Sequence, residues 1–175
     1  MNIQNKTYSA KPSEVTRKWY VIDASEAPLG RVAARVATLL TGKEKPMFTS
    51  HIDCGDFVVI INAKDTVVTG KKATDKIYYR HSGFPGGIKQ RTFNEQMEKD
   101  ATHAIFHAVR GMLPVNKLRD DRLARLKIYE GPDHKHEAQK PVVLSVKSIA
   151  TTLKPGDRPS VKKAAKPEVS SEGDK

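Results

Sequence analysis

Cysteine and long apolar runs are scarce in this 175-residue chain. A single cysteine, Cys54, cannot form an internal disulfide, which fits a reducing compartment. The longest uninterrupted apolar run covers only Phe57 to Ile61, far short of the roughly 20 residues that span a bilayer. No apolar stretch follows the basic residues near the start of the chain, so we do not expect a secretory signal. These absences argue against a disulfide-stapled secreted domain and against a membrane partner.

Negative charge is also in short supply. The chain has 31 lysines and arginines against 20 acids, a net charge of +11 and a pI near 9.7. Such an excess indicates a polyanionic partner, most often nucleic acid, and its spread along the whole chain suits a protein with phosphates on several sides. The length leaves room for one domain plus tails. A basic enzyme remains the alternative at this point.

The hydrophobic pattern predicts an α/β domain. Residues 19–23 favour a strand, apolar positions from Leu29 to Gly42 follow helical spacing, and residues 57–61 are apolar on both faces, as in a buried parallel strand. Strand, helix and strand in this order form a βαβ unit. The polar segment 43–56 between them is long for a connection, and such loops are often functional.

The second half of the chain predicts shorter elements. Three further strands are expected, over residues 66–69, 77–81 and 126–129. Three helices are expected, the first from a Thr-x-x-Glu capping box at Thr92, the second after Asp100 as far as Pro114, and the third from Asn116 to about Arg125. Few large apolar residues follow Pro155, which predicts a disordered tail.

An α/β pattern first suggests a nucleotide-binding enzyme, but the phosphate-binding motifs of such enzymes are absent. A dinucleotide fold needs G-x-G-x-x-G after its first strand, whereas residues 23–30 hold one glycine and two acids. A P-loop needs Gly-Lys-Ser/Thr, and neither Gly42-Lys43 nor Gly70-Lys71 is followed by that hydroxyl residue. No catalytic set of residues emerges, so we expect a protein that is not an enzyme.

Cys54 lies among His51, Asp53 and Asp56, which raises a nucleophile or a metal site as alternatives. Acidic neighbours disfavour the negatively charged thiolate that a nucleophile or a metal ligand needs. The spacing also lacks the paired ligands of zinc sites. We interpret Cys54 as a structural loop residue and expect no metal and no cofactor.

Basic residues form clearer groups. Arg31 and Arg35 lie four positions apart, opposite the apolar face of the first helix, with Lys43 and Lys45 beyond its end. Arginine forks match the geometry of phosphate. His103, His107 and Arg110 form a similar polar stripe on a later helix. An ordinary solvated helix face is the alternative for both stripes.

Residues 76–94 contain four cations and no acid, interleaved with Tyr78, Tyr79 and Phe84. Aromatic side chains beside cations can stack on unpaired bases while the cations neutralise phosphates. The alternative is that one of the two tyrosines belongs to the core. The glycine-rich segment 82–87 would let backbone N–H groups approach phosphate, or it is a purely structural turn.

Several uncommon strings recur in the same order in one known family: Lys18–Ala24, Leu29–Arg31, His51–Asp56, Asn62–Ala63, Thr69–Lys71, Tyr79–Gly87, Val109–Pro114 and His134–Pro141. From about Lys6 to Val146 the chain resembles the large-subunit ribosomal protein thirteen family in its bacterial form. The resemblance implies a three-layer α/β/α fold with a small, mainly parallel sheet of about four strands. We expect a basic N-terminal arm over 1–18, the α/β domain over 19–147 and a C-terminal extension over 148–175.

The resemblance also implies a non-enzymatic role in the cytoplasm, in the ribosome. The expected partners are large-subunit ribosomal RNA, bound early in subunit assembly, and neighbouring large-subunit ribosomal proteins, with no small-molecule substrate and no membrane. A regulatory RNA-binding protein that acts off the ribosome is the alternative.

We expect RNA contacts from the basic groups and the glycine-rich segment. The expected residues are Lys6, Lys11, Arg31, Arg35, Lys43, Lys45, Lys71, Lys72, Lys76, Arg80, His81, Gly83, Gly86, Gly87, Lys89, Arg91, Arg110 and Lys117. The chain departs from the family in two places. After Asn116-Lys117-Leu118, where the family commonly has glycine, this chain has Arg119 followed by two aspartates, and about 30 residues continue beyond Leu144, near which family members usually end.

Overall fold

The computed structural model describes residues 8–146, so Lys6, the first part of the predicted arm and the predicted extension over 148–175 lie outside the described residues. A parallel four-stranded sheet has the order β5-β2-β1-β6. Its strands are β1 (Trp19–Asp23), β2 (Phe57–Ile61), β5 (Leu126–Ile128) and β6 (Val142–Val143). The predicted α/β class and the parallel sheet of about four strands are confirmed.

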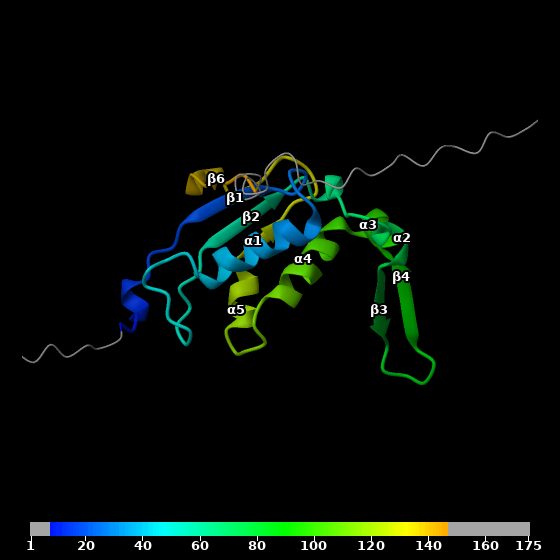
Figure 1. Ribbon diagram of the computed structural model, residues 1–175, viewed down its shortest axis with the longest axis horizontal. Coiled ribbons are helices and arrows are strands. Elements are labelled where there is room, and N and C mark those ends of the chain that lie inside the picture. Colours follow the sequence, from blue (N-terminus) through cyan, green and yellow to red (C-terminus); the bar gives the residue numbers. More distant parts are fainter. Residues whose placement is uncertain (1–7, 147–175) are drawn as a thin grey trace, which may run out of the picture.

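Two long helices cover one face of this sheet (Figure 1): α1 (Leu29–Thr41) and α4 (Ala101–Met112). The core between them contains Ile22, Val58 and Ile60 from the strands. Helix α1 begins after Pro28 and ends at Gly42, whose left-handed backbone donates its N–H to carbonyls of the last turn. The predicted βαβ unit is therefore present with its expected boundaries.

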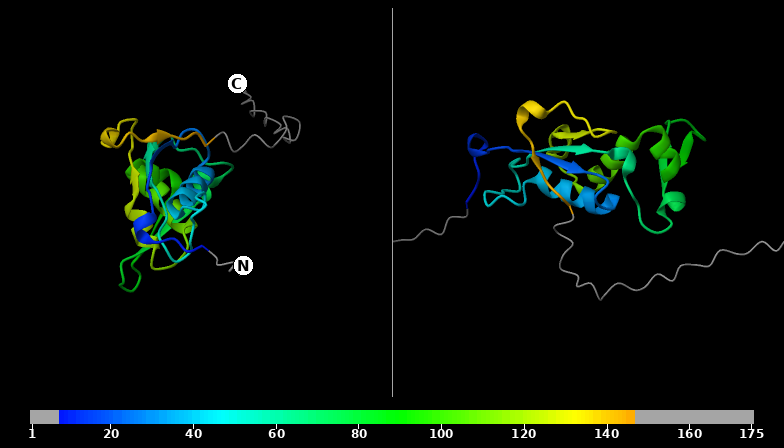
Figure 2. Two further views of the ribbon diagram at one scale, coloured as in Figure 1. Left: turned by 90° about the vertical axis from the view of Figure 1, so that its left-hand side faces the viewer. Right: turned by 90° about the horizontal axis from the view of Figure 1, so that it is seen from above.

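The opposite face of the sheet has a thinner cover, made by the segment after β5 that contains the 3₁₀ turn η3 (Glu137–Gln139) (Figures 1 and 2). Trp19 stacks on Phe57 with ring centroids 4.3 Å apart, and His136 lies over Trp19 at 5.0 Å. Because both faces are covered, Val21 and Val59 are buried on this side too.

A separate antiparallel ribbon projects from one end of the domain (Figure 1). It pairs β3 (Ile77–His81) with β4 (Ile88–Thr92). The short helices α2 (Lys72–Asp75) and α3 (Phe93–Lys99) lie at its base. Strand β4 was not predicted, whereas the capping box at Thr92 is confirmed: Thr92 Oγ1 accepts from Glu95 N and Glu95 accepts from Thr92 N.

The other end of the domain holds the segment 43–56, against which the chain packs at Ser9 and Ala10 (Figures 1 and 2). Ala10 is buried there, and its N–H donates to Thr49 Oγ1 at 3.0 Å, just before the 3₁₀ turn η1 (Pro12–Glu14). A further 3₁₀ turn, η2 (Ala63–Asp65), follows β2. The ribbon and the segment 43–56 thus mark opposite ends of the sheet.

Two predicted elements differ from the structure. Residues 66–69 form no strand, because the carbonyl of Val67 accepts from Leu29 N at the start of α1 instead of joining a ladder. Asn116 does not cap the next helix; its side chain accepts from Leu118 N in a turn, and α5 (Arg119–Ala124) begins only afterwards.

Candidate nucleic-acid interface

Helix α4 is the central element of the candidate interface. Asp100 caps it, since its carboxylate accepts from His103 N at 3.1 Å and Thr102 Oγ1 at 2.6 Å. Ala104, Ile105 and Val109 are buried on the inner face, which leaves His103, His107 and Arg110 exposed on the outer face. The polar stripe expected from the sequence therefore faces solvent.

The β3–β4 ribbon has two faces of opposite character. The antiparallel register pairs Tyr78 with Arg91 and Arg80 with Lys89, which places these four side chains on one face. The other face carries Ile77, Tyr79 and Ile88, all exposed, together with uncharged Thr92 and Gln90 and with His81. Charge is thus confined to one side of the ribbon.

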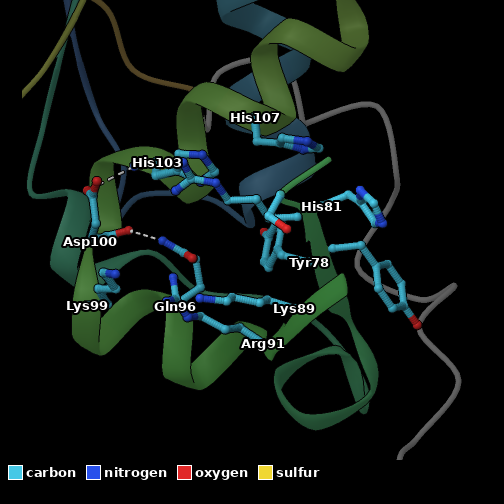
Figure 3. A pocket seen from close by; sticks show the side chains of 12 residues that line it. Tyr78, His81, Lys89, Arg91, Gln96, Lys99, Asp100, His103 and His107 are labelled. Carbon is cyan, nitrogen blue, oxygen red and sulfur yellow. Dashed lines mark hydrogen bonds between the residues drawn. The ribbon is translucent and has the colours of Figure 1, made fainter. Parts of the chain in front are cut away.

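A hollow of about 740 Å³ lies between the cationic side of the ribbon and helices α3 and α4 (Figure 3). Four permanent cations line it from three elements: Arg80, Lys89, Arg91 and Lys99. His81, His103 and His107 add imidazoles, and Tyr78 and Gln96 lie among them. Residues from β3 to α4 converge there because α3 and α4 turn back over the ribbon.

Among the residues that line this hollow, the only acid is Asp100. Its hydrogen bond from Thr102 and those from the backbone of the α4 N-terminus hold the pKa of Asp100 below its ordinary value. The negative charge is therefore present at neutral pH, but it is directed at the helix cap. The field in the hollow is consequently positive.

His107 occupies the border of this hollow, with its ring 5.7 Å from Tyr78 in an edge-on arrangement. Partial burial lowers the pKa of His107, and the charges of His103, Lys76 and Arg110 lower it further. His107 is thus neutral at pH 7 in the free protein, and an anion in the hollow would favour its protonated form.

A second hollow, of about 650 Å³, adjoins the first and also uses His107. Arg31, Lys72 and Lys76 line it, and no acid does. We name the whole area the α4 basic surface. Its members are Arg31, Lys72, Lys76, Arg80, Lys89, Arg91, Lys99, His103, His107 and Arg110.

Two helical glycines line the second hollow, Gly30 in α1 and Gly111 in α4. A Cβ added at either position would meet nothing within 4 Å, and neither backbone has a positive φ. Glycine inside a helix costs about 0.5–1 kcal/mol relative to alanine. The described part of the chain supplies no packing reason for either glycine, whereas a close external surface would supply one.

The glycine-rich segment of the ribbon has an internal explanation. Gly83 and Gly86 have φ of +93° and +71°, in the left-handed region that favours glycine. A Cβ at Gly87 would collide with Ser82, whose N–H donates to the Gly87 carbonyl at 3.1 Å. The turn alone accounts for these glycines, so their contact with RNA stays a prediction.

The remaining predicted residues do not line either hollow. Arg35 forms an ion pair with Glu44, and Lys45 donates to Asp56 at 2.6 Å and to the Thr16 carbonyl at 2.7 Å. These two cations are engaged within the protein. Four other predicted lysines are exposed: Lys11 before η1, Lys43 after α1, Lys71 before α2 and Lys117 before α5.

Three basic residues that line the first hollow were missing from the expected RNA contacts, although two of them belonged to the polar stripe of the later helix: Lys99, His103 and His107. Their spacing of four residues is a helical signal that the sequence offered. The break between α3 and α4 at Asp100 obscured it, because the three positions belong to two helices whose relative direction the pattern does not give.

The residues around Cys54 serve the fold. Asp53 accepts from both terminal nitrogens of Arg125, and Cys54 is fully buried with its thiol 3.8 Å from the Met47 carbonyl. Residues 8–146 contain no group of three or more His, Cys, Asp or Glu side chains able to hold a metal. Within the same range, no helix has the length and hydropathy to cross a membrane.

Comparison with known proteins gives a consistent result. The family model described as Ribosomal protein L13 matches residues 17–135. A protein of Symbiobacterium thermophilum named large ribosomal subunit protein uL13 is 54% identical over 142 residues, which cover 81% of this chain and 99% of that protein. A protein of the same name from Syntrophus aciditrophicus is 54% identical over a match that spans 79% of this chain, and one from Mycolicibacterium smegmatis is 51% identical over 82% of this chain. Each match spans 98% of the relative's own length.

Proposed function

The chain belongs to the ribosomal protein L13 family, and from this premise we propose that it is a structural protein of the large ribosomal subunit that binds ribosomal RNA through the α4 basic surface. The curated relatives carry the large subunit in their name. The α4 basic surface supplies the chemistry that such a role needs, since it presents cations to phosphate.

The observation that carries this proposal is the convergence of cations from separate elements. Arg31 comes from α1, Lys72 from α2, Arg80 and Arg91 from the ribbon, and Lys99 from the end of α3, yet all line two adjoining hollows. Like charges repel in the free protein, so their gathering is unfavourable without a counter-ion. A polyanion that follows the surface would relieve this repulsion.

The two helical glycines support the same proposal. Gly30 and Gly111 line the second hollow without a side chain of their own, and Arg31 and Lys72 line the same hollow. A nucleic-acid backbone could then approach the helices closely while the flanking cations neutralise its phosphates.

A binding experiment with matched variants tests the proposal. We expect the fourfold change of Arg31, Lys72, Lys76 and Arg110 to glutamine to weaken binding to a large-subunit ribosomal RNA fragment at least tenfold. The control changes Lys18, Lys127, Lys135 and Lys140 to glutamine, which removes the same number of charges from exposed sites that line neither hollow and are not among the expected RNA contacts. Equal losses in the two variants would show that only net charge matters and would refute the assignment to the α4 basic surface.

We further propose that the protein joins the subunit early in assembly, without enzymatic activity, and in the cytoplasm. A pulse-labelling experiment tests the timing: early entry predicts that newly made protein appears first in precursor particles. Its first appearance in mature subunits would contradict this order.

A further inference from the structure

The hollow between the ribbon and α4 combines charge with an aromatic ring. Tyr78 lies among the labelled side chains at its centre, with Arg91 and Lys89 on one side and His103 and His107 on the other (Figure 3). Its volume of about 740 Å³ lies within the range of about 300–1,000 Å³ found for pockets that enclose small organic ligands.

The Tyr78 ring is held in place by its neighbours. Lys76 Nζ lies 5.3 Å from the ring centroid, and the His107 ring meets it edge-on. The ring is partly exposed, whereas the Tyr78 hydroxyl is buried and has no hydrogen-bond partner among the described residues. The ring of Tyr78, and not its hydroxyl, is therefore the part of this side chain that a ligand in the hollow can contact.

A duplex does not match these features. Its bases are stacked inside and its phosphates lie on a convex surface, so it offers nothing that would fill a hollow lined by a ribbon and two helices. An unpaired nucleotide offers an accessible base and phosphates together, since its base can stack on an aromatic ring while its flanking phosphates contact cations at the edge of the hollow.

We propose that this hollow receives one unpaired nucleotide of a bulge or loop, with its base against Tyr78 and its flanking phosphates on Arg80, Lys89 and Arg91. This inference rests on the proposed RNA-binding function and deepens it, because it names the RNA structure that one half of the α4 basic surface selects. Stacking tolerates every base, so the selection is for an unpaired nucleotide rather than for a sequence.

Two RNA hairpins with the same stem test the proposal, one fully paired and one with a single-nucleotide bulge. The full-length protein should bind the bulged hairpin about tenfold more tightly in fluorescence anisotropy at fixed salt, within the range expected for one stacked base. Tyr78→Leu should abolish this preference and leave the affinity for the paired hairpin within about twofold. Tyr78→Phe should keep the preference, because the ring remains and the buried hydroxyl has no partner to lose.

The outcomes separate the two proposals. Equal binding of both hairpins by the wild-type protein, or a preference that survives in Tyr78→Leu, overturns the nucleotide pocket but not the RNA-binding function. Absence of binding to either hairpin overturns both. A photo-crosslink from 4-thiouridine in the bulge is a second readout that needs no variant: it should map to residues 78–91 or 96–107, and a crosslink confined to other peptides contradicts the proposal.

Discussion

Asp53 is the centre of the densest charge cluster among the described residues. Both terminal nitrogens of Arg125 donate to it, and Arg17 and Arg122 each lie 3.7 Å from its carboxylate. The Arg122 side chain is 2% exposed and that of Arg125 is 8% exposed. One carboxylate therefore compensates two buried guanidinium groups, and it joins the segment 43–56 to α5 and β5.

We expect Asp53→Asn to lower the free energy of unfolding by about 3 kcal/mol, because it leaves buried arginines without their counter-ion. Urea denaturation measures this loss. The control is Glu130→Gln, which breaks the exposed 2.8 Å ion pair with Lys64 and should cost less than about 1 kcal/mol. Similar losses in the two variants would contradict a buried structural role for Asp53.

His107 makes stability depend on pH. Its pKa is lower in the folded protein than the ordinary value of 6.5, so below pH 6.5 the unfolded chain binds more protons than the folded one. This contribution to stability is present above pH 6.5 and is lost as the pH falls toward the lower pKa of the folded state. His107→Gln should therefore flatten the decline in unfolding free energy below pH 6.5 in urea titrations; a profile parallel to that of the wild type would refute it.

At the scale of elements, the sequence predicts best where a segment carries its own signal. Strand β2 is apolar throughout, and α1 repeats its apolar positions and ends at Gly42, so both have the expected bounds. Strand β4 reads Ile-Lys-Gln-Arg-Thr, with no apolar alternation, and it is a strand only because β3 pairs with it. Strand β6 has two residues, too few for any pattern.

The candidate site shows the same division. Composition alone identified Arg80, Lys89 and Arg91 as cations among aromatic residues. These three cations line the same hollow as Lys99 and His103 because α3 and α4 fold back over the ribbon. This tertiary arrangement is not encoded in the local spacing of residues.

Helix α4 allows a prediction in which stability and binding change in opposite directions. Gly111 lies in its last turn with open space around it, so Gly111→Ala should raise the free energy of unfolding by about 0.5 kcal/mol through helix propensity. If RNA approaches this turn closely, the added methyl group should also weaken binding several-fold in anisotropy titrations.

Gly131→Ala is the matched control, since Gly131 also has open space around it but lines neither hollow. It should leave RNA affinity unchanged. Unchanged affinity in Gly111→Ala as well would show that no RNA backbone approaches the end of α4.

At the scale of the whole molecule, the two ends of the sheet have different tasks. At the end with the segment 43–56, several charged side chains form ion pairs within the protein, such as Lys45 with Asp56. At the end with the ribbon, the cations that line the two hollows form no ion pair with any residue in the range 8–146. The net charge of +11 is therefore distributed unevenly: the positive charge that is available to a partner lies mainly at the end with the ribbon.

This asymmetry predicts the salt dependence of binding. If the protein neutralises about six phosphates, the affinity for an RNA fragment should fall with a log–log slope of about −4 to −5. The fourfold glutamine variant of Arg31, Lys72, Lys76 and Arg110 should have a slope less steep by about 3. Anisotropy titrations between about 50 and 200 mM salt measure both values, and a wild-type slope near zero would contradict an electrostatic interface.

The most direct measurement is incorporation into large ribosomal subunits in cells, followed by sucrose-gradient sedimentation. The wild-type protein and the variant with glutamine at Lys18, Lys127, Lys135 and Lys140 should sediment with the large subunit in similar amounts. The variant with glutamine at Arg31, Lys72, Lys76 and Arg110 should remain mainly at the top of the gradient, although its melting temperature is unchanged. Full incorporation of this second variant, or a wild-type protein that does not sediment with large subunits, would contradict the central claim that the chain enters the subunit through its α4 basic surface.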